Sequence, residues 1–164
     1  MSGAPHDEVR RATADDAETI SALNAEVQQA HATALPHLFK PASPEAFPTV
    51  LVRQLIASPG SYLFIAHIDG AAVGYLYAQR IEGRESPSRE AWDRLYVHHL
   101  SVNSASQRQG AGQALMQAVK RLALEQGIST ITLGVWSANS KARAFFAAQG
   151  FAPYQEDMWL RVRD

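Results

Sequence analysis

A strand-like segment, a turn with two glycines and an amphipathic helix follow one another directly between residues 92 and 127. The apolar run Trp92–Val102 is long enough for a central strand. The segment Gly110–Gln126 has the helical spacing of apolar residues, and Gly127 stands where helices commonly stop. The buried face of this helix is expected to carry Leu115, Met116, Val119 and Leu122. A strand that passes through a short turn into a helix predicts an α/β domain.

The remaining apolar patterns predict a mixed sheet with helices on its faces. The other expected strands are Glu8–Thr13, Tyr62–Ile68, Ala72–Ile81, Ile131–Val135 and a last one near Met158–Val162. The other expected helices run from a cap at Asp15 to about Ala30, over Thr49–Ala57 and over Ser140–Gln149. Asp69 and Gly70 lie between two strand-like runs and predict a hairpin turn. No internal repeat or linker interrupts the pattern, so we expect a single domain over residues 1–164.

Composition limits the classes of protein and partner. The chain of 164 residues contains no cysteine, which excludes disulfides, cysteine-ligated zinc and a thiolate nucleophile. Its formal net charge of -1 offers no basic field for nucleic acid. The segment Met1–Arg11 has no apolar core of the kind found in signal peptides, and no later segment approaches the length of a membrane span. We therefore expect a cytoplasmic protein without nucleic-acid or membrane partners.

The turn Gln107-Arg108-Gln109-Gly110-Ala111-Gly112 stands between the expected strand and helix. Consecutive backbone N–H groups at a glycine-containing turn and a helix N-terminus form a site for an anion, and the helix dipole reinforces it. A P-loop is excluded because it needs Gly-Lys-Ser/Thr, and the dinucleotide fingerprint because it needs a glycine where Leu115 stands. The turn predicts a different phosphate ligand, although two glycines near a helix start also occur in ordinary tight turns.

Two motifs in this order resemble the GCN5-related N-acetyltransferase (GNAT) family. The first is Gln107-x-x-Gly110-x-Gly112 after the strand Tyr96–Val102. The second, further along the chain, is Trp136-x-x-Asn139-x-x-Ala142-x-x-Phe145-Phe146-x-x-x-Gly150-Phe151. The opening Val9–Thr13, followed by Asp15 and Asp16, is also similar to the first strand and helix of that family. The resemblance covers nearly the whole chain.

The resemblance implies a splayed sheet of six to seven strands with helices on both faces. The strand ending at Val102 would separate from the strand Ile131–Val135 and open a V-shaped cleft for acetyl-coenzyme A. The backbone of Leu100 and Val102 would pair with the pantetheine amides, while N–H groups of the turn hold the diphosphate. The residues expected at the cofactor are Leu100, Ser101, Val102, Gln107, Arg108, Gln109, Gly110, Ala111, Gly112, Gln113, Asn139 and Phe146. For Asn139, an ordinary helix cap is the alternative.

His98 is the expected general base. An amine acceptor is protonated at neutral pH, so acetyl transfer needs a group that removes a proton. Strict strand alternation places His98 on the face of Leu100 and His99 on the opposite face. In family members with a side-chain base, a Glu or His often stands four residues before the valine of this strand, which is the position of His98. The alternatives are a hydrogen-bonded core histidine for His98 and packing under a helix for His99.

Phe146 departs from the family pattern, because many relatives have a tyrosine there near the coenzyme sulfur. Phenylalanine has no proton to give, so we expect the thiolate to leave with help from water and nearby amides. Tyr154 or Tyr96 acting as the acid is one alternative. Loss of catalysis, which would leave a coenzyme A-binding module, is another.

The acceptor pocket is expected around the proline-rich loop and the hairpin strands. Pro36, Pro41, Pro44 and Pro48 exclude a continuous helix between residues 31 and 48, so this loop either lines a site or connects elements while its apolar residues fill the core. Phe39, Tyr75 and Tyr77 are the expected substrate contacts, because aromatic rings bind alkylammonium groups, although such rings are more often packing. The expected acceptor is a small-molecule amine or a peptide amine. A homodimer is the assembly suggested by the family.

Overall fold

The structure is a computed structural model that describes residues 8–163, and the chain divides into two compact units between Gly134 and Val135. Each unit is described by itself. The first unit contains the sheet, and the second contains one α-helix and the C-terminal segment. Among the described residues, none of the helices is long and apolar enough to cross a membrane.

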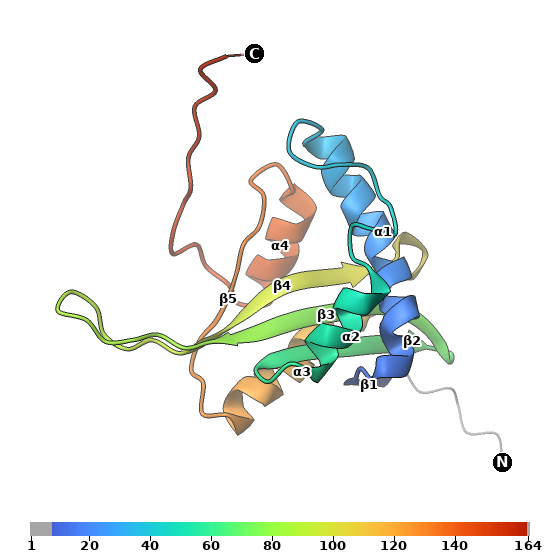
Figure 1. Cartoon of the computed structure of the whole chain (residues 1–164), viewed down its shortest axis with the longest axis horizontal. Coiled ribbons are helices and arrows are strands. Elements are labelled where there is room, and N and C mark those ends of the chain that lie inside the picture. Colours follow the sequence, from blue (N-terminus) through green and yellow to red (C-terminus); the bar gives the residue numbers. More distant parts are fainter. Residues whose placement is uncertain (1–7, 164) are drawn as a thin grey trace. The chain divides into compact units, whose positions relative to one another are not determined.

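The sheet has the strand order β1 (Glu8–Arg11), β2 (Ser61–Ile68), β3 (Ala71–Ile81), β4 (Arg94–Val102) and β5 (Ile131–Leu133) (Figure 1). The first four strands pair antiparallel and β4 pairs with β5 in parallel, so the expected mixed sheet is confirmed. Both residues of the β2–β3 turn, Asp69 and Gly70, have positive φ angles of 51° and 79°. Positive φ at both positions is the geometry of the hairpin turn that an Asp-Gly pair favours.

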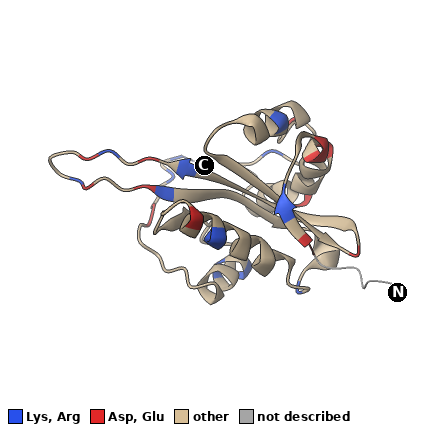
Figure 2. Cartoon of the chain, turned by 90° about the horizontal axis from the view of Figure 1, so that it is seen from below, with Lys and Arg blue, Asp and Glu red and all other residues tan. Residues whose placement is uncertain are grey.

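The sheet of the described residues has five strands instead of the expected six to seven. The expected last strand is wrong: Met158–Val162 has no regular secondary structure, and Met158 and Leu160 are 94% and 85% exposed. A strand is defined by hydrogen bonds to a neighbouring strand, and an apolar alternation can predict only the conformation of the segment, not its partner. The connection of β3 to β4 projects beyond the sheet and carries charges of both signs (Figure 2).

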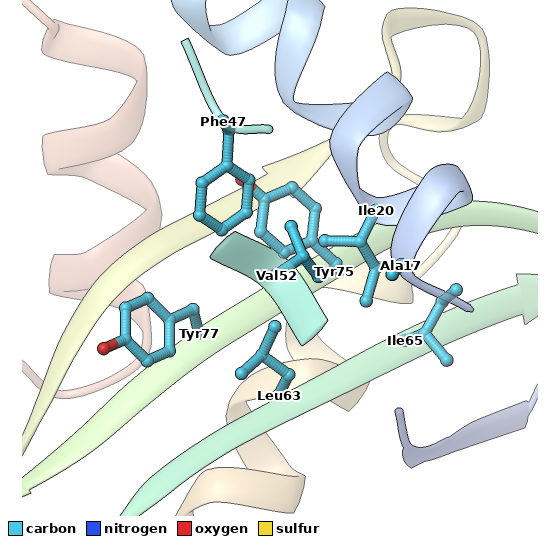
Figure 3. Packing of buried hydrophobic residues seen from close by; sticks show 8 residues of the cluster. All are labelled: Ala17, Ile20, Phe47, Val52, Leu63, Ile65, Tyr75 and Tyr77. Carbon is cyan, nitrogen blue, oxygen red and sulfur yellow. The ribbon is translucent and has the colours of Figure 1, made fainter. Parts of the chain in front are cut away.

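Two helices cover one face of the sheet. They are α1 (Ala17–Ala34), which follows the short 3-10 turn η1 (Ala14–Asp16), and α2 (Thr49–Ala57). Between them and the sheet lies a buried cluster (Figure 3) that consists of Ala17, Ile20, Phe47, Val52, Leu63, Ile65, Tyr75 and Tyr77. We call the face that carries Leu63, Ile65, Tyr75 and Tyr77 the α1/α2 face.

The helix α3 (Ala111–Glu125) packs against the other face of the sheet (Figure 1). Its buried residues include all four that the sequence predicts, Leu115, Met116, Val119 and Leu122. Gly127 has a φ of 66° just beyond the helix end, a left-handed conformation that glycine adopts at low cost. The prediction of helices on both faces is confirmed, and α3 leads from the end of β4 back to β5.

The second unit contains α4 (Ser140–Ala148). Asn139 begins this helix as its cap, because its side-chain oxygen accepts a hydrogen bond of 3.0 Å from the N–H of Ala142. Phe146 is half-buried and makes edge contacts with Phe145 and Phe151, at ring-centre distances of 5.3 and 5.7 Å.

Candidate active site

The strand β4 is longer than its pairing with β5. On the side of β3, β4 is paired as far as Val102. On the side of β5, the ladder covers only the three pairs from Leu95 to Val97. Beyond Val97 the N–H and C=O groups on this side of β4 therefore lie outside the β4–β5 ladder, and they lead toward the turn before α3. A strand edge of this kind can pair with an extended ligand that carries amides.

A bulge in β4 places both histidines on one face. The pairing with β3 passes from Tyr77 opposite His99 to Ala78 opposite Val97, so His98 is an extra residue without a partner in the register. The His98 ring stacks on Tyr77 at 4.7 Å, and Tyr77 belongs to the α1/α2 face. The expectation that His98 and His99 point to opposite faces is wrong, because a bulge interrupts the alternation of a strand.

His98 is partly exposed, and polar and aromatic neighbours surround its ring. Its Nε2 lies 3.0 Å from Oε1 of Gln79, an acceptor, so Nε2 carries the proton and donates it. The Nδ1 atom is then the basic atom of the ring. The Tyr96 ring meets the imidazole edge to face at 4.7 Å. Partial burial of the ring lowers the pKa of His98 below its ordinary value of 6.5, so the imidazole is neutral at pH 7 and can accept a proton.

His99 belongs to a buried chain of hydrogen bonds. Asn24 on α1 donates from Nδ2 to the Tyr75 hydroxyl at 2.8 Å, and this hydroxyl lies 3.0 Å from Nδ1 of His99. Because the hydroxyl accepts a hydrogen bond from Asn24, it donates its own hydrogen bond to Nδ1, and His99 is neutral with its proton on Nε2. Burial first, and then the charges of His98 and His31, lower the pKa of His99 to about 4. Burial also raises the pKa of Tyr75.

The turn after β4 prepares the start of α3. Asn103 caps the 3-10 turn η2 (Ser104–Ser106) by accepting a hydrogen bond of 3.0 Å from the N–H of Ser106. Arg108 and Gly110 have positive φ angles of 64° and 89°, and Gly110 is the N-cap of α3. The first intrahelical bond goes from the N–H of Ala114 to the C=O of Gly110. The N–H groups of residues 111–113 therefore have no acceptor within the helix, and they form the positive end of its dipole.

The structure brings the expected cofactor residues of the first unit together along β4 and this turn, from Leu100 to Gln113. A Cβ added at Gly110 would meet nothing within 4 Å, so the backbone there is open to approach. The Gln107 side chain folds back and donates to the C=O of Val102 at 3.2 Å, which ties the turn to the end of the strand. Asn139 and Phe146 lie in the second unit, and the oxygen of Asn139 is already used as a helix cap.

The expected acceptor residues are differently placed. Tyr75 is fully buried and Tyr77 is 8% exposed, so both rings belong to the core in this structure, and their contact with an acceptor stays a prediction. Their rings pack in the core between α1, α2 and the sheet, and the buried hydroxyl of Tyr75 has its hydrogen-bond partners there. Phe39 is half-buried, lies at a tilt beside the His31 ring at a ring-centre distance of 5.0 Å, and lines a surface hollow of about 400 Å³ with Gln28, Lys40 and Glu45.

Two polar residues of the site, Gln79 and Asn24, were not predicted from the sequence. Gln79 lies two and four residues from Tyr77 and Tyr75 and thus shares their face on β3. Asn24 lies on the apolar side of α1, between Ile20 and Val27. A polar residue among apolar residues on one face commonly binds another buried polar group. This pattern could have indicated Gln79 and Asn24 from the sequence.

A family model described as the acetyltransferase (GNAT) family matches residues 32–151. The chain belongs to the GNAT family. The match includes the bulged strand β4 and the turn before α3, whereas α1 lies almost entirely before it.

One curated GNAT relative is an uncharacterized N-acetyltransferase encoded in the pepI 3′ region of Lactobacillus delbrueckii subsp. lactis. It is 26% identical over 106 residues, which cover 64% of this chain and 60% of the relative. The chain thus matches less than two thirds of that protein's length.

Two solved structures share the fold. A mutant of the BH1408 protein from Bacillus halodurans has a TM-score of 0.91 at 18% identity, and the match covers 95% of this chain and 99% of that chain. The aminoglycoside N-acetyltransferase AAC(6')-Iy in complex with CoA has a TM-score of 0.72 at 16% identity, with coverages of 100% and 99%. At such identities these matches show the GNAT fold alone.

Proposed function

We propose that this GNAT chain transfers an acetyl group from acetyl-CoA to a primary amine, by direct attack of the amine while both substrates are bound. The single observation that carries the proposal is the edge of β4. This edge continues past the last residue paired with β5, Val97, and leads into the turn whose backbone N–H groups begin α3. Membership of the GNAT family supports acetyl-CoA as the donor.

The chemical groups along this path fit the parts of acetyl-CoA. The backbone of Leu100 and Val102 offers donors and acceptors for the two amides of the pantetheine arm. The N–H groups from Arg108 to Gln113 are suited to the diphosphate, because a helix N-terminus stabilises negative charge. Arg108 is exposed and adds a positive charge at this end. An N–H at the same strand edge would stabilise the negative charge that develops on the thioester oxygen.

His98 is the proposed general base. Its proton lies on Nε2, where Gln79 accepts it, so Nδ1 presents a lone pair. The amine is mostly protonated at pH 7, and Nδ1 would take a proton from it directly or through a water molecule. The amine nitrogen then forms a bond to the acetyl carbon and loses its second proton to water, while the bond from that carbon to sulfur breaks and the sulfur takes up one proton. The products are an acetylated amine and coenzyme A.

The test is incubation of the full chain with acetyl-CoA and a panel of amines, followed by mass spectrometry. The panel contains aminoglycosides, polyamines, peptides with free N-termini and lysine peptides, because the acceptor class is open. We expect at least one amine to gain one acetyl group, and His98→Ala to lower kcat/KM for that amine tenfold or more, which is about 1.4 kcal/mol of transition-state stabilisation. Absence of acetylation across all four classes, despite binding of acetyl-CoA, would overturn the proposed activity.

A coenzyme A-binding module without catalysis is the second candidate. Phe146, half-buried among other aromatic rings, favours it because this side chain has no proton for the leaving sulfur. This candidate predicts that acetyl-CoA raises the unfolding temperature, since a ligand at 100 times its Kd adds about 2.7 kcal/mol of stability. It also predicts that the protein acetylates no amine and does not hydrolyse the thioester. The same incubation therefore separates the two candidates.

A further inference from the structure

Tyr96 places its hydroxyl where β4 and β5 separate. The residue is paired with Gln79 on β3 and with Thr132 on β5. A Cβ added at Gly134 would lie 3.1 Å from the Tyr96 hydroxyl oxygen. The hydroxyl therefore lies over bare backbone, next to the last paired residue of β5, Leu133. The missing side chain at Gly134 is what leaves room for it.

The same tyrosine adjoins the proposed base. The ring centres of Tyr96 and His98 are 4.7 Å apart at an angle of 62°, and the Tyr96 side chain is half-buried. Residues 96 and 98 would share a face in a regular strand as well. The bulge changes only the pairing, because it leaves His98 without a partner residue on β3. In the bulged strand, the phenol of Tyr96 and the imidazole of His98 lie next to each other, where the part of β4 that is not paired with β5 begins.

The position of the sulfur follows from the proposed function, on which this inference rests. The diphosphate is proposed at Arg108–Gln113 and the pantetheine arm at Leu100 and Val102, so the arm runs back along β4 toward Val97. A strand advances about 3.3 Å per residue. The thioester is then expected one or two residues before Leu100, at the end of the gap where the β4–β5 ladder begins. The Tyr96 hydroxyl lies at this end.

We propose that Tyr96 is the acid that protonates the leaving sulfur. When the amine nitrogen bonds to the acetyl carbon, the carbon–sulfur bond breaks and the sulfur keeps the electron pair. The Tyr96 hydroxyl gives its proton to this sulfur, while Nδ1 of His98 holds the proton taken from the amine. The bonded nitrogen loses its second proton to water, and the imidazolium returns the first proton to the phenolate through water, so both residues end as they began. Phe146 need not supply a proton in this scheme.

The first test measures the bound thiol and needs no acceptor. The thiolate absorbance of coenzyme A bound to the protein is titrated with pH in the ultraviolet, with desulfo-coenzyme A as the blank. A phenol that donates to the sulfur stabilises the thiolate, so Tyr96→Phe should raise the pKa of the bound thiol by roughly one unit or more. Gly134→Ala should shift it in the same direction but by less, because the added methyl group would stand 3.1 Å from the hydroxyl, which would have to move by a few tenths of an ångström.

The matched control is Tyr62→Phe, which removes a hydroxyl that accepts a hydrogen bond from Gln126 between β2 and α3. We expect this variant to leave the pKa of the bound thiol unchanged. An equal thiol pKa in the wild type and in Tyr96→Phe would overturn the inference.

The second test measures transfer with the amine found above. Tyr96→Phe should lower kcat by about a hundredfold with little change in KM, because the lost proton transfer belongs to the chemical step. An unchanged kcat would also overturn the role of Tyr96. Failure of the proposed function is distinguishable: the wild type would then acetylate no amine, while the thiol titration still decides whether Tyr96 meets the sulfur. If coenzyme A does not bind the wild type, both proposals fail.

Discussion

The hydroxyl of Tyr75 lies 3.0 Å from Nδ1 of His99, and both side chains belong to the face of the sheet covered by α1 and α2. Asn24 donates to the same hydroxyl from α1 at 2.8 Å. This chain of hydrogen bonds joins a helix, the strand β3 and the bulged strand β4. It holds His99 neutral directly beside the proposed base, so the two adjacent histidines have different tasks.

The first prediction concerns the stability of this buried pair. The pKa of His99 is about 4 in the folded protein against an ordinary value of 6.5. The unfolded chain therefore binds more protons between these values, so the contribution of His99 is complete above pH 6.5 and is lost as the pH falls toward 4. We expect a loss of roughly 2 to 3 kcal/mol over this window in urea unfolding at a series of pH values.

His99→Asn is the matched variant, because its amide oxygen can accept the hydrogen bond from the Tyr75 hydroxyl but does not titrate. The pH dependence between 6.5 and 4 should become shallower in this variant; a residual slope is expected because the pKa of His98 is also lowered. The same slope in His99→Asn and the wild type would show that the buried histidine does not titrate as stated.

The second prediction concerns the pH profile of kcat/KM. Since burial lowers the pKa of His98 below 6.5, the acid limb of the profile should lie below that pH. Gln79→Glu places a carboxylate against Nε2–H, which favours the imidazolium and should move the limb to higher pH. Gln79→Met is the control for loss of the acceptor without a charge. An acid limb at the same pH in Gln79→Glu and the wild type would exclude Gln79 as the residue that orients the base.

The third prediction is that one substitution at the start of α3 has opposite effects on protein stability and on acetyl-CoA binding. The first turn of α3 contains no acidic residue, and Gln113 is exposed there. Gln113→Glu should stabilise the protein without ligand by roughly 0.3 to 1 kcal/mol, because a negative charge suits the positive end of a helix. The same charge should repel the diphosphate and weaken acetyl-CoA binding severalfold. Calorimetry and urea unfolding check the two effects, and unchanged or tighter binding in Gln113→Glu would argue against a diphosphate at this turn.

The fourth prediction concerns Asn139. Its oxygen caps α4, so the amide nitrogen is the atom proposed to contact the coenzyme. Asn139→Asp retains a capping oxygen and should keep the stability of the wild type, but it should weaken coenzyme A binding because the donor is lost. Asn139→Ala should in addition cost about 1 kcal/mol of stability. If Asn139→Asp binds coenzyme A as tightly as the wild type does, Asn139 is a cap only.

Local patterns were sufficient for much of the fold. The spacing of apolar residues predicts α2 and α3, Asp69 and Gly70 predict the β2–β3 turn, and the two glycines predict the turn between β4 and α3, as the structure confirms. Each of these features depends on a few neighbouring residues, whose conformational preferences can be inferred from the sequence.

Features that depend on pairing between distant segments could not be predicted in the same way. The bulge at His98 is a property of the register between β3 and β4, and strict alternation therefore assigned the histidines to opposite faces. The burial of Tyr75 depends on Asn24 and His99, which come from two other elements. The apolar alternation near Met158 could not show that this segment lacks a partner strand among the described residues.

The central claim is that backbone N–H groups at the end of β4 and the start of α3 hold a coenzyme A thioester. The most direct measurement is an amide chemical-shift titration of the ¹⁵N-labelled protein with acetyl-CoA. We predict saturable shifts that are largest for the amides of Arg108–Gln113 and Leu100–Val102. Saturation with acetyl-CoA that leaves these amides unmoved, or no saturable shift anywhere, would contradict it.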